Sequence, residues 1–159
     1  MTEQDSWRGK LGRMSQEEIS AFLAGACLMR LACLKYDGRP YIVPMWYEWD
    51  GDSFWVIPRK KSSWAQYLAK NKYCCAVIDE DIPPLRKVLV EGEAYLIEEP
   101  NVGGKWVAIA ERMSVRYLGE HGPDYLQSTL VEPRWLFRIQ PQSITTWQGA
   151  GWAKRYHQV

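Results

Sequence analysis

Two Asp-Gly pairs divide the first third of the chain into short apolar runs. Residues 27–36 end at Asp37-Gly38, and residues 41–49 end at Asp50-Gly51. Asp-Gly favours the tight turns that join antiparallel strands, because glycine accepts the positive φ angle that such turns require. Residues 53–58 supply a third run. The spacing therefore predicts three strands in an antiparallel meander.

Alternating apolar and polar residues predict more strands farther along the chain. They cover residues 73–78, 87–98 and 134–146, and Pro141 within the last strand marks a bulge or an edge. Six short strands can close into a small barrel, which leaves no exposed edge. We therefore expect an α+β protein built on such a barrel.

Helical patterns lie between and before these strands. Ser15 followed by Glu18 forms a capping box, which predicts a helix that stops near Gly25. Apolar side chains at helical spacing predict a second helix that ends near Asn71. Further helices are predicted over residues 102–118 and 122–130.

The length of 159 residues fits one domain, and 47% apolar residues are ordinary for a globular protein. We divide the chain into a polar N-terminal segment (1–13), a barrel domain (14–148) and an aromatic, basic C-terminal tail (149–159).

Charge and cysteine usage exclude several classes of protein. The 20 basic and 19 acidic residues nearly balance, which argues against a nucleic-acid partner. No apolar run reaches the roughly 18 residues of a membrane span, and the polar N-terminus has no secretory core. The four cysteines form no CxxC pair and suggest no metal site. We expect a cytoplasmic location, with no membrane and no metal.

The best candidate site is the basic, hydroxyl-rich segment that joins a strand to the second helix. Arg59 can bind phosphate oxygens, Lys60 and Lys61 add positive charge, and Ser62 or Ser63 can donate a hydrogen bond from the hydroxyl group. The following Trp64 fits a core anchor as well as a ligand wall. A solvated basic loop with serine as a plain helix cap explains the segment equally well.

Two other segments are candidates. Pro44 interrupts the strand over residues 42–47, so unpaired backbone there could bond a planar heterocycle; an ordinary edge strand is the alternative. Trp147 and Trp152 flank small residues in the tail and could cover a flat ligand, although plain packing also explains them.

Taken in order, these segments resemble the pyridoxamine-phosphate-oxidase-like family of flavin-binding split barrels. The resemblance spans roughly residues 14–150 and is carried by residues 38–47, 50–56, 59–64, 68–71, 88–93 and 134–147. It implies a six-stranded antiparallel split β-barrel with flanking helices. It also implies a homodimer that binds FMN at the subunit interface.

The resemblance further implies which residues hold the cofactor. The strand through Val43, Pro44, Met45 and Trp46 would run along the isoalloxazine ring, and the basic loop would hold the phosphate. Lys87 falls near a position where the oxidases place a glutamine on the flavin. The predicted cofactor-binding set is Val43, Pro44, Met45, Trp46, Arg59, Lys60, Lys61, Ser62, Ser63, Trp64, Lys87 and Trp147.

The chain departs from the true oxidases at three motifs. Residues 42–47 replace their strand-two pattern of Arg followed by Val-Leu-Leu-Lys. Their phosphate loop carries Ser-Arg-Lys just before the helix, where this chain has Ser62-Ser63-Trp64, and their C-terminal Arg-Leu signature is not evident. We therefore expect an FMN-dependent oxidoreductase acting on an unknown small molecule, in which the flavin does the redox work. We name no catalytic residue.

Two alternatives remain open. A deazaflavin-dependent reductase would need a basic groove, which Lys60, Lys61, Arg86 and Lys87 could supply. A flavin- or haem-binding module without turnover is the other alternative; haem needs an axial ligand, and the two histidines, His121 and His157, lie outside the predicted site.

Overall fold

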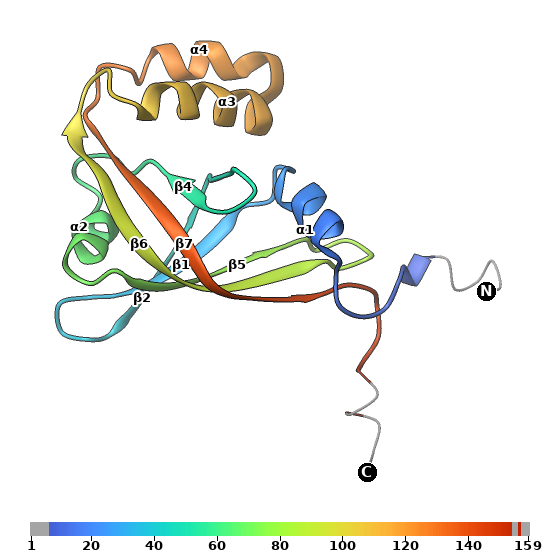
Figure 1. The fold of residues 1–159 in the computed structure, drawn as a ribbon. Coiled ribbons are helices and arrows are strands. Elements are labelled where there is room, and N and C mark those ends of the chain that lie inside the picture. The colour runs from blue at the N-terminus through green and yellow to red at the C-terminus, as the bar shows by residue number, and fades with distance from the viewer. Residues whose placement is uncertain (1–6, 154–155, 157–159) are drawn as a thin grey trace.

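The computed structural model describes residues 7–153 and residue 156 and has the expected α+β architecture (Figure 1). It holds seven strands rather than the six predicted. The strands are β1 (Met29–Leu34), β2 (Pro40–Met45), β3 (Glu48–Trp49), β4 (Phe54–Val56), β5 (Tyr73–Asp79), β6 (Lys87–Asn101) and β7 (Arg134–Trp147). The helices are α1 (Gln16–Leu23), α2 (Ser63–Lys70), α3 (Trp106–Leu118), the 3-10 turn η2 (Gly119–His121) and α4 (Gly122–Gln127).

The strand order shows that the sheet closes on itself. All strands form one sheet in the order β2-β1-β5-β6-β7-β4-β3, so β2 and β3 lie at opposite ends of that order. Only Trp46 and Tyr47 separate them in the chain, a span of roughly 11 Å between Met45 and Glu48 at most. The sheet must therefore curve round until its two ends meet, which gives a barrel.

The predicted meander is wrong at this junction. The β1–β2 and β3–β4 pairs exist, but β2 and β3 do not pair with each other. Residues 41–49, expected as one strand, break because Tyr47 is fully buried and donates a hydrogen bond from its hydroxyl to the Leu23 carbonyl, at 2.9 Å. Tyr47 therefore packs inside the barrel, and the chain does not continue as a hairpin at this point.

The two longest strands, β6 and β7, pair antiparallel along most of their length and cross the whole molecule (Figure 1). The pairing register shifts where Gly92 faces Pro141, which confirms the predicted bulge. Gly92 is required there, because an added Cβ would lie 2.8 Å from the Gln140 carbonyl oxygen.

Helices α1 and α2 bury one face each against the barrel. The capping box is present: Ser15 Oγ accepts from the Glu18 N–H, and the Glu18 carboxylate accepts from the Ser15 N–H. The buried faces consist of Ile19, Phe22 and Leu23 in α1 and of Trp64, Ala65 and Leu68 in α2. They meet inward-facing strand residues such as Leu31, Phe54, Val90 and Phe137.

Helices α3 and α4 form an insertion between β6 and β7, as predicted but with shorter bounds. They stand over one end of the barrel, far from the chain termini (Figure 1). At the other end, Gly12 bridges to Gln148, and the Ala150 N–H donates to the Arg8 carbonyl. The terminal segments are thus paired with each other; His157 lies outside the described residues.

Two further findings concern the described part of the chain. None of its helices is both long enough and apolar enough to cross a membrane. Within the same residues, no group of three or more histidine, cysteine, aspartate or glutamate side chains is placed to hold a metal ion.

Candidate functional site

A pocket of about 330 Å³ opens between the barrel and the α3–α4 insertion. Its walls come from the end of β2, the loop from β4 to α2, both insertion helices and the start of β7. Six of the predicted cofactor-binding residues line it. The full lining is Pro44, Met45, Trp46, Ile57, Pro58, Arg59, Ser62, Trp64, Ala110, Met113, Tyr125, Leu126, Thr129 and Arg134.

One part of the pocket presents two arginines from opposite strands. Arg59 and Arg134 face each other in an antiparallel bridge. The flanking backbone bonds are Lys60 N–H to the Pro133 carbonyl at 2.9 Å and Trp135 N–H to the Pro58 carbonyl at 3.0 Å. Arg59 and Arg134 are therefore the non-hydrogen-bonded pair, in which side chains lie closest and on the same face.

The electrostatics around these arginines are unbalanced. The pocket lining contains no aspartate or glutamate. In the described chain, neither guanidinium forms an ion pair with a carboxylate. Burial, followed by the charge of Arg59, lowers the pKa of Arg134. Two like charges therefore share this part of the pocket without an internal counter-charge.

The N-terminus of α2 adds hydrogen-bond donors beside Arg59. Ser62 occupies the N-cap position, but its side chain makes no capping hydrogen bond. The plain-cap explanation of this serine is therefore not supported, and Ser62 is one of the residues that line the pocket. The unpaired N–H groups of a first helical turn, with the positive end of the helix dipole, favour an anion.

Aromatic side chains form another part of the pocket wall. The Trp46 ring stacks on Tyr117, with ring centroids 4.8 Å apart and an interplanar angle of 3°. Tyr117 is itself fixed by a hydrogen bond from its hydroxyl to the Cys27 carbonyl at 3.0 Å. Tyr125 of α4 approaches Trp46 to 5.5 Å at a tilted angle. One face of Trp46 is thus covered by the protein itself.

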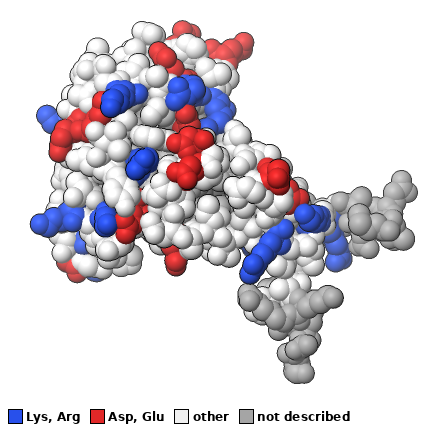
Figure 2. Space-filling view, in the orientation of Figure 1, with Lys and Arg blue, Asp and Glu red and all other residues white. Residues whose placement is uncertain are grey.

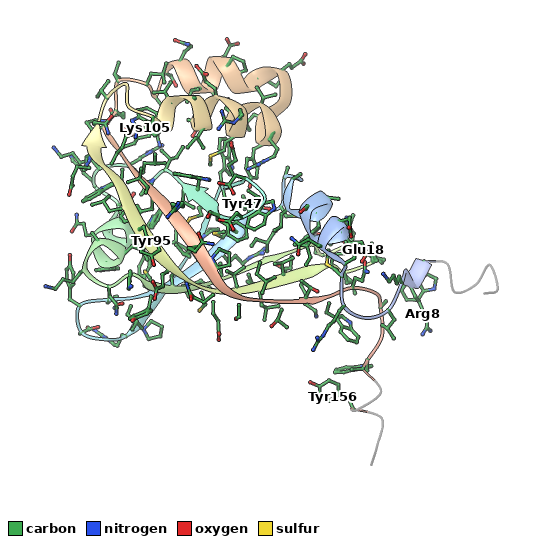
Figure 3. The ribbon with its side chains drawn as sticks, viewed as in Figure 1. Arg8, Glu18, Tyr47, Tyr95, Lys105 and Tyr156 are labelled. Atoms are coloured by element: carbon green, nitrogen blue, oxygen red, sulfur yellow. The ribbon has the colours of Figure 1, made fainter. Side chains whose placement is uncertain are left out.

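The other predicted residues lie outside this pocket. Val43 is half-buried and packs against the core, Ser63 is the half-buried first residue of α2, and Lys60 and Lys61 are exposed. Lys87 and Trp147 pair with each other where β6 begins and β7 ends, and they line a second pocket of about 840 Å³ with the C-terminal tail. Figure 3 shows how far that tail, marked by Tyr156, lies from Lys105 at the insertion.

The sequence reasoning missed the contributions of the insertion and of β7. Arg134 is the first residue of β7, and nothing in its sequence neighbourhood indicates that it faces Arg59. Met113, Tyr125 and Thr129 enter the pocket because two helices fold back over the barrel. Helical periodicity predicted these helices, but not the surface that they would cover.

Charge elsewhere on the visible face is mixed. Figure 2 shows Lys and Arg interspersed with Asp and Glu rather than gathered in one patch. Several charges are paired, including Arg86 with Glu80 at 2.8 Å and Arg112 with Glu48 at 2.7 Å. The unpaired arginines of the pocket therefore contrast with paired charges at the surface.

Known proteins share this fold but differ in what their names say they bind. A FAD-binding protein from Mesorhizobium loti is 19% identical, with a TM-score of 0.64 over 89% of this chain and 98% of that one. An F420 reductase is 22% identical, with a TM-score of 0.60 over 79% and 94%. The haem storage protein HutZ from Vibrio cholerae is 18% identical, with a TM-score of 0.63 over 86% and 96%.

A comparison with curated protein sequences found no match. The family model described as pyridoxamine 5'-phosphate oxidase matches residues 15–148, which include all seven strands, the basic loop and the insertion. The chain therefore belongs to the pyridoxamine 5'-phosphate oxidase family.

Proposed function

We propose that the protein is an FMN-binding oxidoreductase that acts on a small molecule. The observation that carries this proposal is the pocket with two unpaired arginines and no carboxylate in one part and an apolar, aromatic wall in another. FMN has the matching form, with an anionic phosphate joined to a flat ring. The family membership supports the same reading.

In this proposal, Arg59, the Ser62 hydroxyl and the first turn of α2 hold the phosphate. The ring lies along Pro44, Met45 and Trp46, where β2 ends and its edge backbone is unpaired by β3. Bound flavin supplies two-electron redox chemistry. The chain supplies anchoring charge, a shaped wall and shielding from water by the α3–α4 insertion.

We also propose a homodimer in which Lys87 and Trp147 contribute to the partner's pocket. Within one chain they line a different pocket, so they can reach the cofactor only from a second copy. An apolar strip supports this: the exposed Ile42 and Leu89 and the half-buried Val77 line one groove across β2, β5 and β6. Exposed apolar patches of this kind mark contact surfaces.

A deazaflavin coenzyme is the second candidate. The exposed Lys60 and Lys61 favour it, because they lie next to the pocket and could follow an acidic tail outward. Arg86, expected in the same groove, is instead held by Glu80. A haem module has less support, since the pocket lining offers only Met45, Met113 and Tyr125 as axial ligands.

The cysteines support a reducing, cytoplasmic environment as part of the proposal. All four are free thiols. Burial raises the pKa of Cys74 to about 12 and also raises the pKa of Cys33. These two thiols therefore serve as small apolar residues rather than as nucleophiles.

Titration of the purified protein with FMN tests the proposal. We expect saturable binding, followed by bleaching of the flavin absorbance when NADH or NADPH is added. A parallel titration with the deazaflavin coenzyme separates the two candidates. Absence of FMN binding would contradict the proposal, and flavin that binds but accepts no electrons would favour a carrier or sensor.

A further inference from the structure

We infer that Arg134 is a second phosphate-binding residue and that, with Arg59, it selects a phosphate monoester dianion over a singly charged phosphodiester. This inference rests on the proposed function and extends it from the presence of a flavin to the chemical form of its anionic group. Nothing in the resemblance assigns a role to Arg134.

The first step of the argument is the backbone geometry. A non-hydrogen-bonded antiparallel pair places the two Cβ atoms about 4.5–5.5 Å apart on one face. Like charges in that arrangement repel each other and destabilise the pair. Bidentate arginine is especially suited to phosphate oxygens. A phosphate between the two side chains would turn this repulsion into two favourable contacts.

The second step is the way in which Arg134 is held. Its guanidinium lies over the ring of the fully buried Trp106, 5.6 Å from the ring centroid. Its Nε is buried and has no hydrogen-bond partner. Glu132 and Tyr125 also act on Arg134 electrostatically, but neither forms an ion pair or hydrogen bond with it. The side chain is thus positioned by Trp106 and has no internal counter-charge.

The third step is charge balance. A phosphate monoester carries nearly two negative charges near neutral pH, which balances the two guanidinium groups. A phosphodiester carries one, so it leaves one partly desolvated arginine uncompensated, and an uncompensated charge of this kind is costly. The pair therefore favours FMN over coenzymes that present a singly charged diester to this position.

The test compares three ligands that share one ring system: FMN, riboflavin 4',5'-cyclic phosphate and riboflavin. Each is titrated against the full chain and against Arg134→Gln by quenching of flavin fluorescence at constant salt. Arg138→Gln is the matched control, because Arg138 also lies on β7 with a buried, unpartnered Nε but lines none of the described pockets. Thermal melting checks that each variant is folded. Arg134→Lys is a further variant, which keeps the positive charge but not the planar guanidinium group that binds two oxygens at once.

We expect Arg134→Gln to weaken FMN by roughly 10- to 100-fold, the loss of one charge-assisted contact. In Arg134→Gln the affinity for the cyclic phosphate should fall less than that for FMN, and the affinity for riboflavin should not change. Arg134→Lys should recover part of the FMN affinity, and Arg138→Gln should bind all three ligands as the unmodified protein does. An unchanged ratio of FMN to riboflavin affinity would overturn the inference while leaving the proposed function intact. An equal loss for all three ligands would show that Arg134 is only structural. If the unmodified protein binds no flavin, the proposed function fails, and the inference fails with it.

Discussion

Arg59 is the residue on which the proposed phosphate site most depends. It lines the pocket, faces Arg134 and precedes Ser62, the N-cap of α2, by three residues. Because no carboxylate lines the pocket, the charge of Arg59 is not neutralised by an internal ion pair and can act on a ligand.

Arg59→Ala should weaken FMN binding by roughly 1.5–3 kcal/mol, the value of a charge-assisted contact. Isothermal titration with FMN measures this change, and Lys35→Ala, a half-buried lysine outside the pocket, serves as the control. Unchanged FMN affinity in Arg59→Ala would place the phosphate elsewhere.

Gly92 carries a prediction that concerns stability alone. Gly92→Ala should lower the free energy of unfolding by about 1–3 kcal/mol, because the new methyl group would press on the Gln140 carbonyl, which belongs to the backbone. Urea denaturation measures the loss. Glu99→Ala, exposed on the same strand, should change stability by less than about 0.5 kcal/mol; equal effects would contradict the steric explanation.

At the scale of elements, the start of α1 is fastened by one carboxylate. The Glu18 side chain accepts hydrogen bonds from the Ser15 N–H at 2.7 Å, Lys10 Nζ at 3.0 Å and Gln148 Nε2 at 3.0 Å. These contacts lower the pKa of Glu18 to about 2, with the Ser15 N–H as the largest cause. They join the helix to both terminal segments of the chain.

The lowered pKa fixes the direction of a pH effect. The stabilisation by Glu18 is present above the ordinary glutamate pKa of about 4.3 and is lost as the pH falls towards 2. As the pH is lowered from about 4.3 towards 2, the melting temperature should fall less steeply in Glu18→Gln than in the unmodified protein. Parallel curves would show that the carboxylate contributes nothing, and Glu120→Gln, exposed in η2, is the control.

The predictions from sequence succeeded where the signal was local. The Ser15–Glu18 capping box, the bulge at Pro141 and the helix that follows Ser62 all depend on residues close together in the chain. The break at Trp46-Tyr47 could not be predicted, because it follows from a hydrogen bond to Leu23 and from closure of the sheet.

The candidate site divides in the same way. The basic loop contributes Arg59 and Ser62, which the sequence singled out, but Arg134 lies 75 residues beyond Arg59 and meets it only through strand pairing. Lys87 and Trp147 were grouped with the site through the family resemblance. Within one chain they line a different pocket, so any contact with the proposed cofactor requires the proposed second copy.

At the scale of the whole molecule, the exposed strip across β2, β5 and β6 makes dimerisation testable. Ile42 is 66% exposed, so a charge there costs the isolated chain little but would be buried in the proposed dimer. Ile42→Lys should shift the mass measured by light scattering from dimer to monomer.

The matched control is Val131→Lys, which is 73% exposed in the segment between α4 and β7, outside the strip. It should leave the dimer intact. A monomeric unmodified protein, or a dimer that survives Ile42→Lys, would contradict the proposed interface.

The most direct test of the account is a crystal structure of the full chain with FMN. We predict electron density for the phosphate between the Arg59 side chain and the first turn of α2, with the ring along Pro44, Met45 and Trp46. Density for the flavin at a different place, or a phosphate that contacts neither Arg59 nor α2, would contradict the account.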